Sequence, residues 1–277
     1  MQNLEGYEPV IFANHKLILP RLNWKTSIHV DMFNFADTTP YKIYWQMECE
    51  EIVPATQKII DNHEFYDLIL CWNHLVLSEC PNAKFFPSMA TVWTVNADTS
   101  HKKFQVSMLS SSKVLCEGHK FRHQIFKSLG HHMNKIPIIK HMSPPYLPSK
   151  MPLLEPFQYT IVMENAQHPN YFTEKILDAF ATKTIPIYWG CPNIRDFFNI
   201  DGIFEFDHPD HPHTLRDVLS SLRVGDYAER QAAIEDNYQR AMKYYSRTDS
   251  FVQAITDAWT PKIPIIHSGE PNVAPES

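Results

Sequence analysis

The sequence of 277 residues lacks several features that would place it in a class at once. No apolar run approaches the ~20 residues needed to span a membrane, and the opening MQNLEGYEPV has neither the basic start nor the apolar core of a signal peptide. No run of lysine or arginine stands out, and the formal net charge is −6. We therefore expect no membrane span and no nucleic-acid partner.

Cysteine pairing is also missing. The five cysteines form no Cys-x-x-Cys pair and no zinc-like spacing, and their number is odd. We interpret them as reduced thiols of a cytoplasmic protein, in the host cytoplasm if the source is microbial or viral. The fifteen histidines fit no standard spacing of metal ligands, so we predict no bound metal.

The chain does have enough apolar residues for a sizeable core, with 44% hydrophobic and 13% aromatic residues. Strand-like runs at 42–47, 66–72 and 104–109 alternate with helix-like segments at 54–63 and 119–130. This alternation predicts an α/β fold with parallel strands. Residues 21–39 show no clear hydrophobic period.

Proline marks the expected division of the chain. Residues 136–157 hold six prolines, which disfavour helix interiors and central strands, so we predict a linker or surface loop there. The predicted domains are 1–145 and 146–261. Residues 262–277 have few apolar side chains and are predicted to be a mobile tail.

The most informative segment runs from residue 159 to residue 206. A β-prone run at 159–163 is followed by a polar loop at 164–170 and then by a helical pattern for which Thr173 is a plausible N-cap. A second β-rich run at 184–189 closes the unit. Strand–helix–strand units of this kind cross over right-handed and place their two strands parallel.

Polar residues gather where such a unit binds ligands. They are Glu164, Asn165, Tyr171, Glu174 and Lys175, between the end of the strand and the first turn of the helix. A helix N-terminus attracts anions, and a lysine is unfavourable there unless an anion accompanies it. A phosphate would supply that anion, with Glu174 on a ribose hydroxyl. The alternative is a solvated Glu174–Lys175 pair.

The letters MEN followed by YFTEKILDAFATKTIPIYWGCPNI resemble the donor-binding motif of the α1,3/4-fucosyltransferase family, particularly its bacterial members. The resemblance implies two Rossmann-like domains facing across a cleft (GT-B type), with GDP-fucose on the C-terminal domain and a glycan as the acceptor. It also implies that Lys175 grips the diphosphate, Glu174 binds the ribose and Tyr171 packs on the donor. Glu164 and Asn165 would line the donor pocket.

A thinner match implies a second phosphate ligand. The letters SMLSSS and, after a longer loop than the family has, KFRHQIFKSL resemble its Val-Ser-Asn…Arg block, whose arginine reaches the diphosphate. Arg122 stands at that position, and a guanidinium can hold two phosphate oxygens. The alternative is a charge on a surface helix.

A further match implies a catalytic base. The letters YWQMECEEIVP resemble the family's Trp-x-x-x-Glu-Ser-Pro segment, whose glutamate acts as the base, and Glu48 takes that position. Cys49 and Glu50 stand where Ser-Pro is expected, so Glu50 and Glu51 remain alternatives for the base. Neighbouring carboxylates raise one another's pKa, which suits a base. A solvated acidic loop is the other interpretation.

The sequence contains no Asp-x-Asp, the usual metal-binding motif of metal-dependent transferases. We therefore expect an inverting, metal-independent glycosyltransferase with no cofactor other than its donor, most simply a fucosyltransferase. Two alternatives stay open. One is the same fold acting on another nucleotide sugar such as UDP-xylose, and the other is a non-catalytic glycan-binding module.

Overall fold

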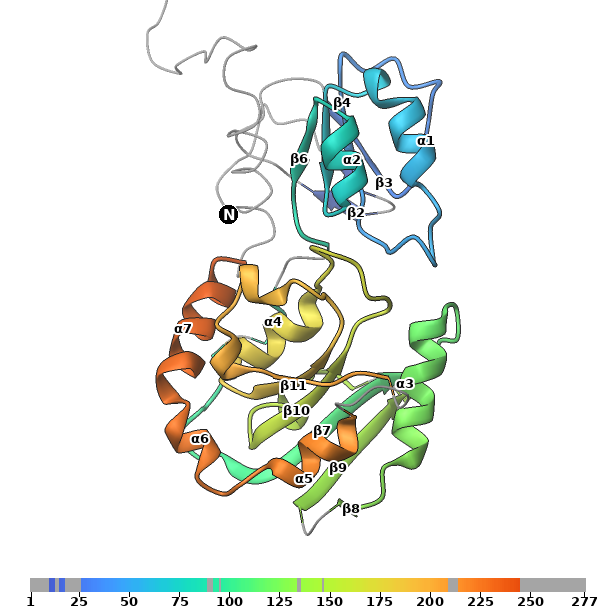
Figure 1. The fold of residues 1–277 in the computed structure, drawn as a ribbon. Helices are drawn as coiled ribbons and strands as arrows, with labels where there is room; N and C mark the ends of the chain where they lie inside the picture. The colour runs from blue at the N-terminus through green and yellow to red at the C-terminus, as the bar shows by residue number, and fades with distance from the viewer. Residues whose placement is uncertain are drawn as a thin grey trace, which may run out of the picture.

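The computed structural model describes residues 10–12, 15–17, 26–88, 92–94, 96–133, 136–145, 147–208 and 214–244, and its strands form three sheets. The smallest sheet is an antiparallel pair that contacts the first of two larger sheets. Figure 1 shows the two larger sheets one above the other, each with its own helices. The strands of the small pair are β1 (Val10–Phe12) and β2 (His15–Leu17).

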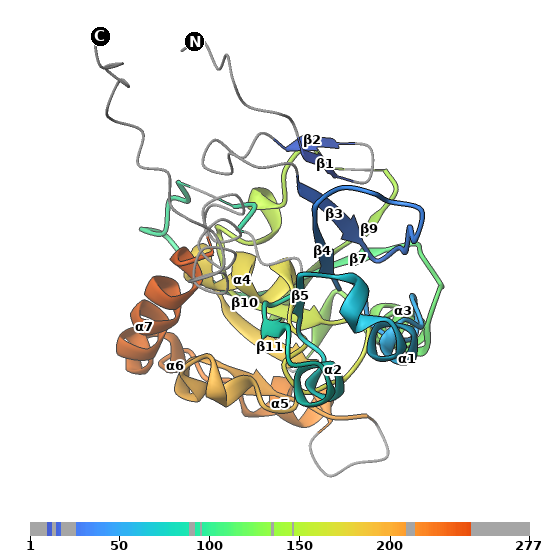
Figure 2. The ribbon, with the colours of Figure 1, turned by 90° about the horizontal axis from the view of Figure 1, so that it is seen from above.

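The upper or N-terminal sheet is parallel throughout, with the strand order β3-β4-β5-β6. Figure 2 shows its two helices side by side on one face, where the core holds Tyr44, Ile59, Ile69 and Val76. The elements are β3 (Thr26–Val30), β4 (Tyr41–Trp45), α1 (Thr56–Asp61), a 3-10 turn (His63–Phe65), β5 (Leu68–Cys71), α2 (His74–Glu79) and β6 (Ala83–Phe85).

The lower or C-terminal sheet has the order β12-β11-β10-β7-β9-β8, and all its pairings are parallel except that of β8 with β9. Its strands are β7 (Lys103–Ser111), β8 (His132–Met133), β9 (Ile136–Ser143), β10 (Phe157–Met163), β11 (Ile185–Trp189) and β12 (Phe204–Glu205). Its helices are α3 (Glu117–Ser128), α4 (Glu174–Ala181), α5 (Leu215–Ser221), α6 (Asp226–Glu229) and α7 (Gln231–Met242), with 3-10 turns at Met151–Leu153, Ile194–Asp196 and Ile200–Gly202.

Both faces of this sheet are covered, as in a doubly wound α/β fold. On one face, Phe121 of α3 and Leu219 of α5 pack against strand residues such as Ile161. On the other face, Phe180 of α4 lies in a core with Val162. Successive residues of β10 therefore serve opposite cores, which is the period of two that a strand imposes.

The predicted strand–helix–strand unit is confirmed as β10, α4 and β11. The two strands pair parallel, from Tyr159 with Ile185 to Met163 with Trp189. Thr173 is the N-cap of α4, because its hydroxyl accepts a hydrogen bond from the backbone N–H of Lys175 at 3.3 Å. The α/β fold class with facing parallel sheets is also confirmed.

The division between the two sheets differs from the predicted boundary at residues 145 and 146. Strands β7 and β9 both precede that boundary, yet they pair with each other and, through β7, with β10. The sheets therefore divide between β6 and β7. The connecting residues pack on the C-terminal unit, where the backbone N–H of Val92 donates to the carbonyl of Tyr244 at 3.2 Å.

The proline-rich stretch 136–157 is not wholly a linker, because it begins with β9. Pro137 is the second residue of β9, and the pairing with β7 starts only at Ile138, so the missing N–H of Pro137 interrupts no bond to β7. The other five prolines follow the strand. Proline content misled the prediction because the six residues from Ile138 to Ser143 contain none.

Two predictions at the C-terminal end have different outcomes. The helical pattern near 214–245 is confirmed as α5, α6 and α7, and α5 begins with a capping box between Thr214 and Asp217. The predicted mobile tail, 262–277, lies outside the described residues. Among helices in the described ranges, none is long and apolar enough to cross a bilayer.

Candidate active site

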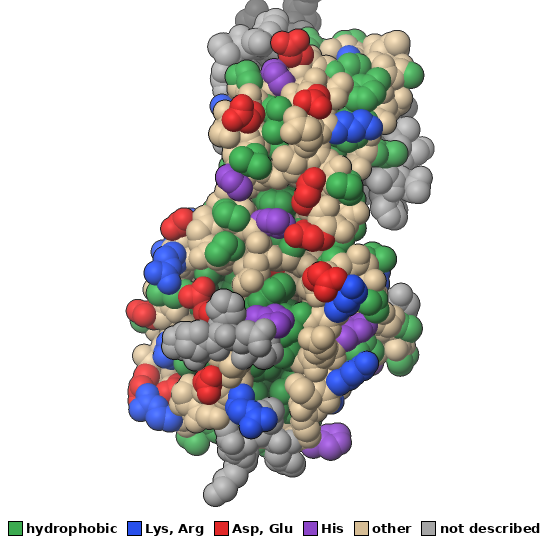
Figure 3. Space-filling model, turned by 45° about the vertical axis from the view of Figure 1, so that its right-hand side comes forward, with side chains coloured by type: hydrophobic (Ala, Val, Ile, Leu, Met, Phe, Trp, Pro, Cys, Tyr) green, Lys and Arg blue, Asp and Glu red, His purple; other side chains and the backbone are tan. Residues whose placement is uncertain are grey.

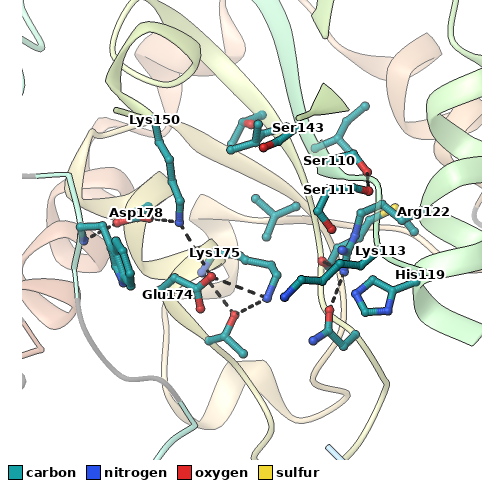
Figure 4. Close-up of a pocket in the computed structure, with 18 of the residues that line it drawn as sticks. Ser110, Ser111, Lys113, His119, Arg122, Ser143, Lys150, Glu174, Lys175 and Asp178 are labelled. Carbon is teal, nitrogen blue, oxygen red and sulfur yellow. Dashed lines mark hydrogen bonds and ion pairs between the residues drawn. The ribbon is translucent and has the colours of Figure 1, made fainter. Parts of the chain in front are cut away.

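A cavity of about 530 Å³ lies at the carboxyl ends of the strands of the C-terminal sheet and is also bordered by the loop after β4. Open parallel sheets bind ligands at this edge. Its floor is formed by parts of β7 and β10, and charged side chains of the C-terminal unit line its walls (Figure 4). The charged lining residues are Glu48, Lys113, Arg122, Lys150, Glu174, Lys175 and Asp178.

Lys175 occupies the predicted place, in the first turn of α4 at the cavity wall. Its Nζ lies 3.0 Å from Thr173 Oγ1, 3.3 Å from Glu164 Oε2 and 3.8 Å from Glu174 Oε1. Burial works against its charge, but the two carboxylates outweigh burial and raise the pKa of Lys175. The lysine is therefore held charged and in a fixed place before any ligand arrives.

Glu164 lies beneath the cavity and is not among the residues that line it, which differs from its predicted place. Its carboxylate is fully buried and accepts hydrogen bonds from the N–H of Thr173 at 3.0 Å and from the Thr173 hydroxyl at 2.7 Å. Together with the bond to Lys175, these contacts occupy both carboxylate oxygens. Glu164 therefore fixes the start of α4.

Glu174 lies at the wall between two lysines. Its Oε1 is 3.8 Å from both Lys150 Nζ and Lys175 Nζ. Burial disfavours its charge, but these cations outweigh burial and lower the pKa of Glu174. Lys150 in turn binds Asp178 at 2.8 Å, and Asp178 accepts the N–H groups of Trp93 and Thr94. Lys150, Asp178 and Trp93 were not predicted as site residues from the sequence, although Asp178 lies within the motif that begins at Tyr171.

Arg122 lies on α3 and also reaches the cavity, so it is not a surface charge. One terminal nitrogen donates to the carbonyls of Met163 and Glu164, both at 2.8 Å, and to Asn165 Oδ1 at 3.0 Å. Its buried Nε has no hydrogen-bond partner in the described part of the chain. Burial lowers its pKa, yet an arginine keeps its charge in proteins.

The approach of α3 to the loop after β10 depends on Gly118. A Cβ at this position would lie 2.0 Å from the carbonyl oxygen of Asn165. Cys116 Sγ, at the helix N-cap, also contacts that carbonyl, at 3.2 Å. This close packing brings Arg122 and Asn165 together at the cavity wall.

Tyr171 lines the cavity, but its ring also joins the two sheets. It is buried to 1% exposure and packs on Trp72 of the N-terminal unit, with ring centroids 4.8 Å apart. Nearby, Asn170 Nδ2 donates to the carbonyl of Trp72 at 3.3 Å, and His168 pairs with Glu51 at 2.9 Å. Figure 3 shows histidine and acidic side chains together at the waist between the sheets.

The structure separates the three acidic candidates of the loop after β4. Of the three, Glu48 alone lines the cavity, from the N-terminal side. The Glu50 carboxylate accepts the backbone N–H of Thr56 at 3.2 Å and its hydroxyl at 2.5 Å, at the start of α1. Glu51 is occupied by His168 at the waist. The geometry therefore favours Glu48 over its two neighbours as a group that meets a ligand.

Asp31 holds the loop that carries Glu48 and was missed in the sequence. It follows β3, and its two carboxylate oxygens accept the N–H groups of Met47 and Glu48 at 2.8 and 2.9 Å. Burial, with a contribution from Glu48, raises the pKa of Asp31 to about 6. The sequence carried one signal for Asp31, because this acidic residue directly follows the short run TSIHV, much as Glu48 lies shortly after β4. The signal was missed because residues 21–39 show no clear hydrophobic period.

No group of three or more His, Cys, Asp or Glu side chains in the described ranges is placed to hold a metal ion. The five cysteines are all buried and unpaired. Several charged groups at the cavity wall pair with one another, among them Lys175 with Glu174 and Lys150 with Asp178.

Comparison with known families identifies the family to which the chain belongs. Residues 99–252 match the model of glycosyltransferase family 10 (fucosyltransferase), C-terminal part, which is more than half of the chain. The chain belongs to this family. The match includes β7 to α7, and so contains Arg122, Asn165, Glu174 and Lys175 but not Glu48.

Curated relatives are similar to parts of the chain. The α-(1,3)-fucosyltransferase FucT of Helicobacter pylori is 35% identical over 77 residues, which is 24% of this chain and 16% of the relative. The α-(1,3)-fucosyltransferase B of Drosophila melanogaster is 35% identical over 79 residues, 28% of this chain and 18% of the relative. The chain thus matches less than a fifth of the length of either relative.

Among the solved structures similar to the chain is the pneumococcal O-GlcNAc transferase GtfA in complex with UDP and GlcNAc. It superposes on 91% of this chain and 65% of its own, with a TM-score of 0.54 and 10% identity. At that identity the likeness shows the fold alone. It agrees with two facing α/β units over nearly the whole chain.

Proposed function

We propose that this protein transfers fucose from GDP-fucose to a hydroxyl of a glycan, with inversion at the anomeric carbon and without a metal ion. The observation that carries the proposal is the placement of Glu48 on one side of the cavity and of Arg122, Glu174 and Lys175 on the other. A base opposite a cluster of phosphate and ribose ligands is what inverting transfer from a sugar nucleotide requires.

In this mechanism Glu48 takes the proton of the acceptor hydroxyl. The acceptor oxygen bonds to the anomeric carbon of the donor as the bond from that carbon to the diphosphate oxygen breaks. Attack from the face opposite the leaving group inverts the configuration. The negative charge that develops on the diphosphate is stabilised by Lys175 and by the charge of Arg122.

The remaining residues hold the donor or the groups that bind it. Glu174 is placed to accept ribose hydroxyls, and Asn165 and Tyr171 border the same space. Glu164, beneath the cavity, positions the donor-binding groups indirectly, because it accepts hydrogen bonds from Thr173 and Lys175. Stabilisation by protein cations, together with the absence of Asp-x-Asp from the sequence, supports transfer without a metal.

Names of relatives support fucose as the sugar, since two partial matches are α-(1,3)-fucosyltransferases. Another nucleotide sugar such as UDP-xylose remains the rival donor, and a glycan-binding module without catalysis is the rival class. The buried free thiols support a reducing location such as the cytoplasm, which we also propose.

A transfer assay separates these functions. The full chain is incubated with GDP-fucose and a panel of galactosyl and N-acetylglucosaminyl acceptors, and released GDP and product glycans are quantified. We expect equal amounts of GDP and fucosylated glycan, with the anomeric configuration opposite to that of the donor. Consumption of UDP-xylose instead would reassign the donor, and glycan binding without nucleotide release would establish the binding module.

A further inference from the structure

We propose that Lys113, on the loop between β7 and α3, is a third diphosphate ligand that completes the donor site when the nucleotide binds. This inference rests on the proposed function. It begins with the position of the residue, since Lys113 lines the cavity and in Figure 4 its side chain points into it. Neither the motif of α4 nor the arginine block of α3 contains Lys113.

The other cations of the cavity are already occupied. Lys175 lies within 3.3 Å of Thr173 and Glu164 oxygens, and Lys150 lies 2.8 Å from Asp178. One terminal nitrogen of Arg122 serves three protein acceptors. These groups supply positive charge to a ligand, but several of their hydrogen bonds are already used to hold the wall together.

Lys113 differs from these cations in having no internal partner. It is exposed and forms no hydrogen bond or ion pair with any residue in the described ranges. Its charge nevertheless lies close enough to the other cations to act on the same group. Burial first, and then the charges of Arg122, Lys175 and Lys113, lower the pKa of His119 to about 4.

Lys113 adds a positive charge beside Arg122 and Lys175, and the repulsion among these like charges is relieved when an anion binds among them. A nucleoside diphosphate is such an anion, and its oxygens would accept hydrogen bonds from an unoccupied ammonium group. Lys113 is therefore the cation that gains most from the ligand.

The loop is anchored at both ends and exposed in the middle. Ser112 N–H donates to the carbonyl of Ser143 at 2.7 Å, and Leu115 N–H donates to His119 Nδ1 at 3.3 Å. Between these anchors Val114 is 53% exposed and Leu115 is 61% exposed, although Leu115 also borders the cavity. The anchors fix the backbone near Lys113 beside the cavity and leave its long side chain able to settle on a ligand.

The test compares nucleotide affinities of the full chain by isothermal titration in the absence of acceptor. The ligands are GDP, GMP and guanosine, and the variants are Lys113→Ala and Lys113→Arg. Lys120→Ala is the matched control, because Lys120 lies on α3, is exposed and pairs only with Glu117 at 2.5 Å.

We expect Lys113→Ala to weaken GDP binding about tenfold, the size of one charge-assisted hydrogen bond. It should weaken GMP binding less and leave guanosine binding unchanged. Lys113→Arg should restore most of the GDP affinity, and Lys120→Ala should bind all three ligands as the wild type does. Thermal unfolding should be unchanged in all variants, since neither lysine is buried.

Three results would overturn the inference. Equal GDP affinity of Lys113→Ala and wild type would remove Lys113 from the donor site while leaving the proposed function intact. An equal loss for guanosine and GDP would mean that the variant disturbs the pocket without a phosphate contact. Failure of the wild type to bind GDP would overturn both the inference and the proposed function.

Discussion

The two walls of the cavity are built in different ways. The wall from the C-terminal sheet is a continuous network in which Glu164, Thr173 and Lys175 come from one strand–helix connection. The wall from the N-terminal sheet offers Glu48, whose loop is held from another strand by Asp31. The first wall holds its charged groups in fixed places through these contacts, and the second presents one carboxylate to the cavity.

The difference suggests a division of labour that variants can separate. In the proposed function the charged groups of the C-terminal wall bind the donor, so changes there should act on nucleotide affinity. The proposed role of Glu48 is to meet the acceptor, so changes in the N-terminal wall should act on turnover.

The largest effect is expected for Glu48→Gln, which keeps the shape of the side chain but removes the proton acceptor. Turnover should fall by roughly 10²–10⁴, the usual contribution of a general base, while GDP affinity stays unchanged. The measurement is kcat at saturating donor together with GDP titration.

The matched controls for that variant are its two acidic neighbours. Glu51→Gln should transfer at nearly the wild-type rate, and Glu50→Gln should lose stability through Thr56 more than it loses turnover. If either control abolishes transfer while Glu48→Gln is active, the assignment of the base is wrong.

Lys175→Ala should produce the next largest effect, on the opposite quantity. GDP affinity should fall about tenfold to a hundredfold, because a charged donor to the diphosphate is lost. The melting temperature should also drop, since the buried carboxylate of Glu164 loses its cation at 3.3 Å. Isothermal titration measures the first effect and calorimetry the second, with Lys120→Ala as control. Unchanged GDP affinity would contradict the phosphate role of Lys175.

Asp31→Asn should have a smaller effect that depends on pH. The pKa of Asp31 is raised to about 6, so its carboxylate gains a proton as the pH falls through about 6 and loses an acceptor for one of the two N–H groups it binds. Wild-type turnover should therefore decline on the acid side of about pH 6. The amide variant resembles the protonated state, so its turnover near neutral pH should be lower by about five- to tenfold.

The pH profile also distinguishes this positioning role from simple loss of structure. The difference in turnover between wild type and Asp31→Asn should shrink below about pH 6, because the Asp31 carboxyl of the wild type is then protonated and as neutral as the amide of the variant. Asp61→Asn, on the exposed side of α1, serves as control. A loss of turnover that is constant at every pH would contradict the proposed clamp.

Removal of divalent metal ions is expected to have no effect on the transfer rate. In the proposed function protein cations stabilise the leaving diphosphate, so EDTA should leave the transfer rate unchanged. The rate is compared with and without EDTA and after addition of Mn²⁺ or Mg²⁺. An absolute requirement for either ion would mean that Arg122 and Lys175 do not suffice to stabilise the leaving group.

The contrast between the walls also explains what the sequence could predict. The strand–helix–strand unit around Lys175 could be predicted because a strand, an N-cap residue and an amphipathic helix follow one another closely in the sequence. The places of Asn165 and Lys175 at the cavity wall followed from the same local order, whereas Arg122 was indicated only by the resemblance of its segment to the family's arginine block. Residues whose neighbours are distant in sequence gave no such signal.

Three examples show where prediction failed. Asp31 was missed because its role depends on N–H groups 16 and 17 residues away. Glu164 was expected at the pocket wall, but its side chain turns down to the start of α4, which only the packed structure determines. The boundary between sheets was misplaced because proline frequency concealed β9, a strand with a proline only at its start.

The most direct test of the account is a paired measurement on wild type and Glu48→Gln. Both proteins are titrated with GDP in EDTA and then supplied with GDP-fucose and an acceptor glycan, and the fucosylated product is quantified. The account predicts equal GDP affinities, with fucosylated glycan from the wild type and almost none from Glu48→Gln. Product formation by Glu48→Gln at the wild-type rate, or loss of GDP binding in that variant, would contradict it.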